Sequence, residues 1–365
     1  MPAATSRKGK SRAAPAGEEK VQAVMPLGKQ LAHTDKKVRD RAVASLVAFL
    51  SQGGDTEGES SSYVRLSDSE MAKLWKGLFY CFWMSDKPLV QQALAADLAE
   101  LLLLIKPRSD SPEDRFKASL AFLEGFWDAI VREWAGIDRL RMDKYYLLMR
   151  RYVNATFRLL ARESWRAEAV EAVNMILSKN GGPMTWEDRR VPTSIATHIA
   201  DIYLDELDKA LALPEVDSQP ACPLTSVLQP HIALLTRTPT STVHARLMSS
   251  IFTPLLESLA LASPSLSLDR DEGEERPSKR SKKESKSRPM YAHIVMHSCI
   301  GTAAKSGTPQ TTERATPEKL RSGLLKAMFV AAADEKAGES NRRKVYQVWR
   351  EEGGGDDDDD EEDEE

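Results

Sequence analysis

The sequence GTAAKS, Gly301 to Ser306, comes closest to a nucleotide-binding motif. A phosphate loop needs a glycine directly before its lysine, because the backbone amides must wrap closely around the phosphates. Ala304 stands at that position, and the surrounding pattern predicts no strand, loop and helix in succession. The motif therefore does not predict nucleotide hydrolysis.

A second cluster, His293, His297 and Cys299, has a spacing that could place two or three ligands near one metal ion. No further ligands follow, and a structural zinc site needs a complete, correctly spaced set. We therefore expect ordinary, partly buried side chains here and no metal. Four other histidines stand singly on expected helices, where structural or surface roles are the default: His33, His198, His231 and His244.

Motifs of common enzymes are absent from the sequence, which has no nucleophile elbow, no HExxH and no dinucleotide-binding glycine fingerprint. Carboxylates are plentiful, but no pair stands out as a catalytic dyad. We predict a protein that is not an enzyme and has no cofactor and no small-molecule substrate.

A basic stripe is expected on the helix that begins near Asp138. A rotation of about 100° per residue places seven mostly apolar side chains on one inward face. They are Met142, Tyr145, Tyr146, Met149, Val153, Thr156 and Leu160. The same rotation gathers five basic residues on the opposite side, namely Arg141, Lys144, Arg151, Arg158 and Arg162. This stripe is either an RNA-binding surface that follows phosphates or a solvated helix face.

Two segments near the C-terminus carry opposite charge. The run RPSKRSKKESKSR, Arg276 to Arg288, has seven basic residues and is typical of a nuclear-import signal. We expect Lys279, Arg280, Lys282 and Lys283 to carry it; the alternative is a charged linker. The last ten residues, Asp356 to Glu365, are all acidic, and without those ten charges the formal net charge changes from −4 to +6. This tail serves solubility, receives basic proteins such as ribosomal proteins, or competes with RNA for the basic stripe.

Compartment follows from the cysteines and from the hydrophobic runs. Three widely separated cysteines with no paired spacing predict reduced, intracellular thiols, namely Cys81, Cys222 and Cys299. The N-terminal residues lack the apolar core of a secretory signal, and no later run is long enough to cross a bilayer. We therefore expect no membrane association.

Apolar side chains recur every three or four positions over residues 27–262, and this pattern predicts helices almost throughout. Ser67 and Glu70 form a capping box, flanked by a hydrophobic staple of Leu66 and Met71. Pro254 should kink the helix expected over Thr240 to Ala262. The pattern predicts an all-α fold of degenerate HEAT-like antiparallel helix pairs stacked into a curved array.

Composition divides the chain into five segments. We expect a disordered basic N-terminus over 1–25, a helical-repeat body over 26–262, and a disordered basic linker over 263–289. A C-terminal segment with two short helices follows over 290–351, with helix caps at Thr316 and Ser340. A disordered acidic tail over 352–365 ends the chain.

Four strings resemble the eukaryotic ribosomal RNA processing protein 1 family. They are KLWKGLFYCFWMSDKPLVQQALA from Lys73, FWDAIVREWAGIDRLRMDKYYLLMRR from Phe126, VPTSIATHIADIYLDEL from Val191 and NRRKVYQVWR from Asn341. The clear resemblance covers about residues 26–213 and returns near the C-terminus. It implies a HEAT-like, nuclear and mainly nucleolar component of early large-subunit precursor particles, required for maturation of precursor ribosomal RNA. It implies no catalytic site and no active-site residues to transfer.

The leading interpretation is therefore a non-catalytic nucleolar assembly factor that acts as a scaffold for precursor large-subunit ribosomal RNA and other assembly factors. One alternative is a helical-repeat nuclear transport or chaperone adaptor for basic cargo. A second is an enzyme with an unrecognised site, such as a nuclease. Co-purifying molecules distinguish the first two, and an RNA-cleavage assay tests the third.

Overall fold

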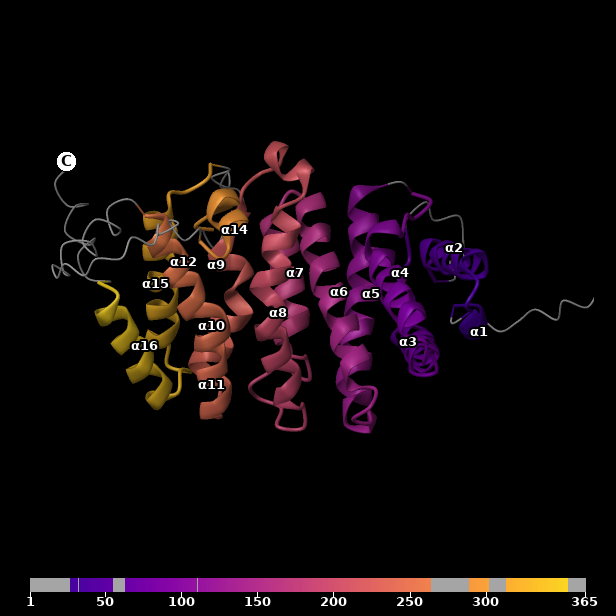
Figure 1. The fold of residues 1–365 in the computed structure, drawn as a ribbon, viewed down its shortest axis with the longest axis horizontal. Helices are drawn as coiled ribbons and strands as arrows, with labels where there is room; N and C mark the ends of the chain where they lie inside the picture. Colours follow the sequence, from indigo (N-terminus) through magenta and orange to yellow (C-terminus); the bar gives the residue numbers. More distant parts are fainter. Residues whose placement is uncertain are drawn as a thin grey trace, which may run out of the picture.

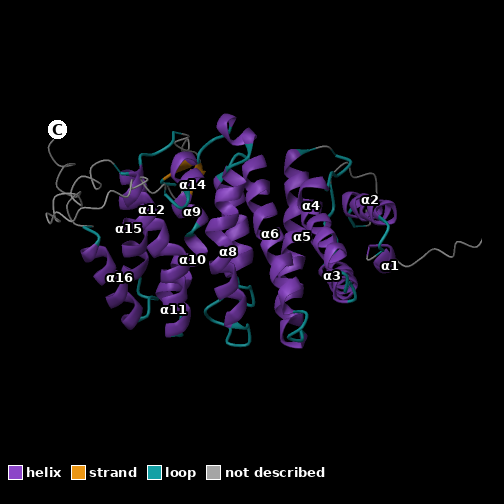
Figure 2. Ribbon diagram, viewed as in Figure 1, coloured by secondary structure: helices purple, strands orange, loops and turns teal. Residues whose placement is uncertain are grey.

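A computed structural model describes residues 27–31, 33–54, 63–109, 111–263, 289–301 and 313–353. Helices dominate these residues, and Figures 1 and 2 show them side by side along the long axis, from α1 at one end to α16 at the other. The all-α prediction is confirmed, whereas the assignment to the HEAT-like class stays a prediction. None of the described helices is long and apolar enough to cross a membrane.

The first half of the array consists of eight α-helices. They are α1 (Leu27–Leu31), α2 (Lys36–Gln52), α3 (Asp68–Trp83), α4 (Pro88–Leu104), α5 (Pro112–Glu133), α6 (Met142–Arg162), α7 (Ala167–Ser178) and α8 (Thr193–Leu211). Helices α2, α4, α6 and α8 contact one another in succession, and so do α3, α5 and α7. The chain thus alternates between two layers of helices.

The second half has shorter elements. They are α9 (Leu224–Val227), α10 (Gln229–Arg237), α11 (Ser241–Leu247), α12 (Thr253–Ala262), α14 (Ala292–His297), α15 (Pro317–Ala333) and α16 (Glu339–Glu351). Short 3-10 segments occupy Trp134–Gly136 and Pro214–Ser218. Helix α15 packs on α10 and α12, and α16 packs on α10 and α15, so the C-terminal helices contact the body.

Local sequence signals set several helix ends. The Ser67 and Glu70 capping box forms as predicted, and both staple residues, Leu66 and Met71, are buried. Thr316 caps α15 by accepting a hydrogen bond from the Lys319 backbone amide. Ser340 does not cap α16, however, because that helix begins one residue earlier and has Gly338 at its N-cap.

Two further expectations need correction. The predicted helix at Asp138 begins only at Met142, because the Asp138 carboxylate accepts hydrogen bonds from the backbone amides of Leu140 and Arg141 and holds a turn. The irregularity expected at Pro254 is a π-helical segment, Met248–Phe252, just before it. Proline lacks an amide hydrogen and its ring crowds the preceding turn, which a wider π turn relieves.

A small parallel sheet joins the chain on either side of the expected linker. Strand β1 (Cys222–Pro223) pairs with β2 (Ser298–Cys299), with Cys222 opposite Ser298, although the sequence pattern predicted no strand. Nearby, the Asp208 carboxylate of α8 accepts the backbone amides of His293 and Ile294, both at 2.9 Å. These contacts fix α14 against the body. The linker itself and both expected disordered ends lie almost wholly outside the described residues.

The core between the layers is rich in aromatic rings. The Tyr152 ring of α6 stacks on Phe126 with centroids 3.7 Å apart, and its hydroxyl donates to the Leu98 carbonyl of α4 at 2.9 Å. The Trp75 indole of α3 donates to the Phe122 carbonyl of α5 at 3.1 Å. Each ring buries a large apolar area while its polar atom is satisfied, which fixes how the helices sit against one another.

Candidate RNA-binding surface

Helix α6 carries the predicted basic stripe, but it lies between α4 and α8 and is covered on more than one side. The predicted inward residues Tyr145, Met149, Val153, Thr156 and Leu160 are indeed buried. Met142 and Tyr146, the other two, are partly buried. The rest of the helix surface therefore decides which basic side chains reach solvent.

Lys144 is a correction to the expected stripe, because its side chain is only 5% exposed. Its Nζ donates to the carbonyls of Trp83 at 2.6 Å and Ser85 at 3.1 Å, just where α3 ends. Burial lowers the pKa of Lys144, with Asp86 acting in the opposite direction. A cation at a helix C-terminus satisfies carbonyls that have no partner within the helix. Lys144 thus caps α3.

Arg162 has a similar structural role at the end of α4. Its Nη1 donates to the Leu103 carbonyl at 3.3 Å, a carbonyl that Arg115 also contacts at 3.0 Å. Its Nε lies 3.2 Å from the Glu163 carboxylate. Burial lowers the pKa of Arg162, and the neighbouring Arg115 lowers it further. The Arg162 guanidinium is therefore held by its contacts with the end of α4 and with Glu163.

Arg141 and Arg158 are about one-third exposed and ion-paired. Arg141 lies 2.6 Å from Asp138 and its guanidinium stands 4.9 Å from the Trp83 ring centroid. Arg158 makes a two-pronged contact with Glu100 of α4. Such pairing leaves less of each guanidinium for a phosphate.

Arg151 is the fifth predicted residue, and it is exposed on α6. It has no ion-pair partner within 4 Å in the part of the chain that the structure describes. The structure therefore does not bring the five residues together as one unpaired stripe. Arg151 is exposed to solvent, whereas Arg141 and Arg158 are only partly exposed.

Ion pairs tie together the layer that contains α6, a feature that the sequence analysis missed. Each pair joins an arginine to a carboxylate on a neighbouring helix. The pairs are Arg39 with Asp97, Arg158 with Glu100, Arg150 with Glu206 and Arg246 with Asp201. Residue spacing within one helix cannot reveal these ion pairs, because the two partners of each pair lie on different helices.

A second basic surface lies on α16, within the string NRRKVYQVWR. Arg343, Lys344 and Arg350 are exposed there, whereas Arg342 donates to the carbonyls of Ala332 and Asp334 at 2.8 Å. The Tyr346 ring stacks on Phe329 of α15 and the Trp349 ring lies tilted against it, each with centroids 4.8 Å apart. The sequence indicated a basic helix here, and the aromatic contact shows how it attaches.

The nuclear-import candidates Lys279, Arg280, Lys282 and Lys283 lie outside the described residues, as does most of the GTAAKS string. His293 and His297 stack with ring centroids 6.1 Å apart. Across the described residues, no three metal-ligating side chains gather in one place. Cys81, Cys222 and Cys299 are all buried, and none of them forms a disulfide bond with another described residue.

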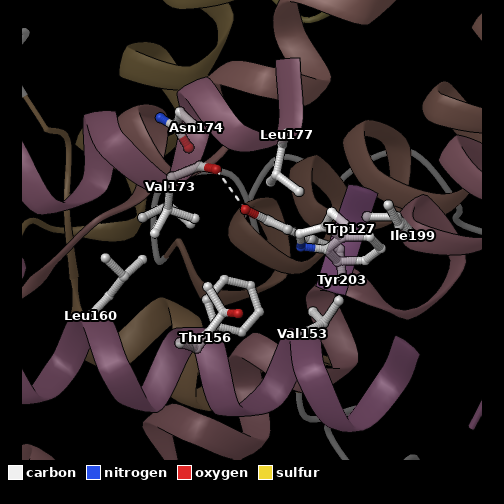
Figure 3. A pocket seen from close by; sticks show the side chains of 11 residues that line it. Trp127, Val153, Thr156, Leu160, Val173, Asn174, Leu177, Ile199 and Tyr203 are labelled. Atoms are coloured by element: carbon white, nitrogen blue, oxygen red, sulfur yellow. Dashed lines mark hydrogen bonds between the residues drawn. The ribbon is translucent and has the colours of Figure 1, made fainter. Parts of the chain in front are cut away.

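A small cavity of about 20 Å³ lies between α5, α6, α7 and α8. Figure 3 shows its mostly apolar wall, which includes Trp127, Val153, Leu160 and Ile199. The Tyr203 hydroxyl donates to the Val227 carbonyl at 2.7 Å, and burial raises the pKa of this tyrosine. A volume of this size holds about one water molecule. It is a packing space within the core.

Comparison with known proteins gives a consistent result. A family model described as "Nucleolar protein, Nop52" matches residues 22–349. The human protein named ribosomal RNA processing protein 1 homolog B is 36% identical over 187 residues, which make up 51% of this chain and 23% of that protein. The mouse homolog A is 31% identical over 237 residues, or 65% of this chain and 44% of that protein. The Drosophila melanogaster homolog is 32% identical over 154 residues, or 42% of this chain and 21% of that protein. The chain thus spans less than half the length of these relatives.

Proposed function

The chain belongs to the Nop52 family of nucleolar proteins, and from this premise we propose that it is a non-catalytic scaffold in precursors of the large ribosomal subunit. The match over residues 22–349 carries the proposal, because it runs through nearly the whole helical array. Relatives named for ribosomal RNA processing support a role in that process. The family description supports a nucleolar location within the nucleus.

The proposed partners are precursor large-subunit ribosomal RNA and other assembly factors. An elongated array with a large exposed surface suits such a role, because it can contact several partners at once. On this proposal Arg151 contacts RNA phosphates, and Arg141 and Arg158 support it from either side along α6. Basic ribosomal proteins are proposed partners of the acidic tail.

Ultraviolet cross-linking of the full chain to RNA in particles tests the contact. Arg151→Glu should reduce cross-linking without affecting folding, because the side chain is exposed and unpaired among the described residues. Lys37→Glu, an exposed change on α2, is the matched control. Unchanged cross-linking by the Arg151 variant would exclude this contact.

Arg158 needs a different design, because reversing its charge alone breaks the pair with Glu100. The double variant Arg158→Glu with Glu100→Arg keeps an ion pair but moves the positive charge to α4. Reduced cross-linking in the double variant supports an RNA contact of the guanidinium at position 158. Full cross-linking means that Arg158 serves the helix packing only.

Nuclear import is proposed to depend on Lys279, Arg280, Lys282 and Lys283. Neutralising all four should move a tagged protein toward the cytoplasm, and a protein that stays nuclear must use another signal.

The adaptor alternative predicts co-purification with import receptors and free basic cargo, in place of precursor RNA. Purified protein should leave precursor RNA uncut with or without divalent metal, and cleavage would favour the nuclease alternative.

A further inference from the structure

An open groove of about 770 Å³ runs between α7 and α15. Helices α9 and α10, which lie between these two along the array (Figure 1), form its floor. Each helix lines it with one face. The α10 residues are Gln229, Ala233 and Arg237, which are four positions apart. Walls built from helix faces at this spacing suit an elongated ligand better than a compact one.

Two apolar side chains on the α7 and α15 walls of the groove are exposed. Met175 on the α7 wall is 63% exposed, and Val330 on the α15 wall is 61% exposed. Ala233 on the floor and Ala331 on the α15 wall are small, so a ligand can approach the helix backbones closely. Large exposed apolar side chains that gather in one concave place mark a site that another apolar surface covers.

Charge around the groove is unevenly distributed. Glu168 and Glu171 are exposed on α7, and neither has an ion-pair partner within 4 Å among the residues that the structure describes. By contrast, several carboxylates in the layer that contains α6 form ion pairs with arginines of a neighbouring helix. Lys326 lines the opposite wall, so the negative side of the groove is the α7 side.

The C-terminal ends of α10 and α15 meet at one end of the groove. Arg237, the last residue of α10, lies 3.4 Å from Asp334, the C-cap of α15, and 5.0 Å from the ring of Trp186, which follows α7. The carbonyl ends of helices carry partial negative charge. The Arg237 guanidinium already offsets these partial charges here, so the preference of the groove for a positively charged ligand rests on the α7 side.

We propose that the groove binds an amphipathic helix of another protein. Its apolar face lies on Met175, Ala233 and Val330, and its flanking lysines or arginines face Glu168 and Glu171. The 12 residues of α7 give a wall of about 18 Å, enough for about three turns of the bound helix. The proposal rests on the proposed scaffold function, because it identifies a surface through which a scaffold holds another assembly factor.

Site-specific photo-cross-linking in cells tests the proposal with the full chain. A photoreactive amino acid is placed at Met175 or at Val330, and at exposed Leu89 of α4 as the control. Both groove positions should cross-link to one segment of one partner protein, with apolar residues every three or four positions and basic residues beside them. Cross-links to RNA, cross-links to a second copy of this chain, or a yield no higher than at Leu89 would overturn it.

Variants show whether the groove chemistry holds the partner. Met175→Asp should reduce the cross-link from Val330 by at least about tenfold, since it places a charge on the apolar surface. Glu171→Lys should reduce it by about threefold through repulsion. Leu89→Asp and Glu257→Lys, exposed changes elsewhere, should leave it unchanged. If precursor RNA still cross-links to the chain while these groove tests fail, the groove proposal is wrong and the scaffold function stands.

Discussion

Gly125 shows how a single residue sets the distance between α3 and α5. A Cβ atom at this position would lie 2.5 Å from Trp75 and 2.7 Å from Met71, both on α3. Glycine in a helix normally costs stability relative to alanine, because it loses more conformational freedom on folding. Here the missing side chain makes room for the buried indole.

The predicted effect of alanine therefore has opposite signs at two helical glycines. Gly125→Ala should lower the free energy of unfolding by about 2 kcal/mol, because the added methyl overpacks the core. Gly77→Ala on α3, where nothing lies within 4 Å of the new Cβ, should raise it by about 0.5 to 1 kcal/mol. Urea unfolding of both variants measures the difference. A stabilised Gly125 variant would contradict the close contact.

His231 on α10 is fully buried against the Tyr203 ring, with centroids 4.1 Å apart. Neither ring nitrogen has a hydrogen-bond partner in the described part of the chain. Burial lowers the pKa of His231 from 6.5 to about 3. The folded state therefore keeps the ring neutral while the unfolded state takes up a proton below pH 6.5. Its contribution to stability is complete above pH 6.5 and is lost progressively as the pH falls toward 3.

Replacing this histidine should remove that pH dependence. When the pH falls from 7.5 to 5.0, the free energy of unfolding of the wild type should fall by about 2 kcal/mol relative to that of His231→Leu, because only the wild type has a histidine at this position that is protonated in the unfolded state. Urea unfolding of both proteins at the two pH values gives the comparison. An equal loss of stability in both proteins would show that His231 is hydrated or charged in the folded state.

At the scale of elements, the ion pairs between neighbouring helices matter because some partners are buried. Glu206 of α8 is 4% exposed, and it accepts from Arg150 of α6 at 2.8 Å and from Lys209 at 2.7 Å. Removing one partner of a buried carboxylate leaves part of its charge without compensation. The α6 and α8 contact should therefore be sensitive to Arg150.

Arg150→Met should lower the free energy of unfolding by about 2 kcal/mol. Arg190→Met is the matched control, because Arg190 pairs with Asp188 while its side chain is 90% exposed, and its loss should cost less than about 0.5 kcal/mol. Thermal or urea unfolding compares the two. Equal effects would mean that the Glu206 carboxylate does not depend on α6.

Helix positions could be predicted because their signals are local. The Ser67 and Glu70 capping box and the cap at Thr316 each involve residues within a few positions of one another. The exposure of Lys144 could not be predicted in the same way. A rotation of 100° per residue gives its direction on α6, but the end of α3 covers that direction, and the packing of the two helices is not encoded in either one alone.

At the scale of the whole molecule, two layers of helices form one elongated array, and the strands β1 and β2 join residues separated by the expected linker. The strand pair is too short to leave an alternating pattern in the sequence. The four strings that resemble the family were enough to predict the family of this chain, and the family model that matches residues 22–349 confirms that prediction. The RNA contact and the groove depend on surfaces that form only when distant segments pack together.

The most direct test of the proposed function is the processing of ribosomal RNA in cells from which the protein has been removed. We predict that precursors of the large-subunit RNA accumulate, that small-subunit RNA matures normally, and that the full chain restores processing on re-expression. Hybridisation to the precursor and mature RNAs measures all three. Normal maturation of large-subunit RNA without the protein would contradict the account.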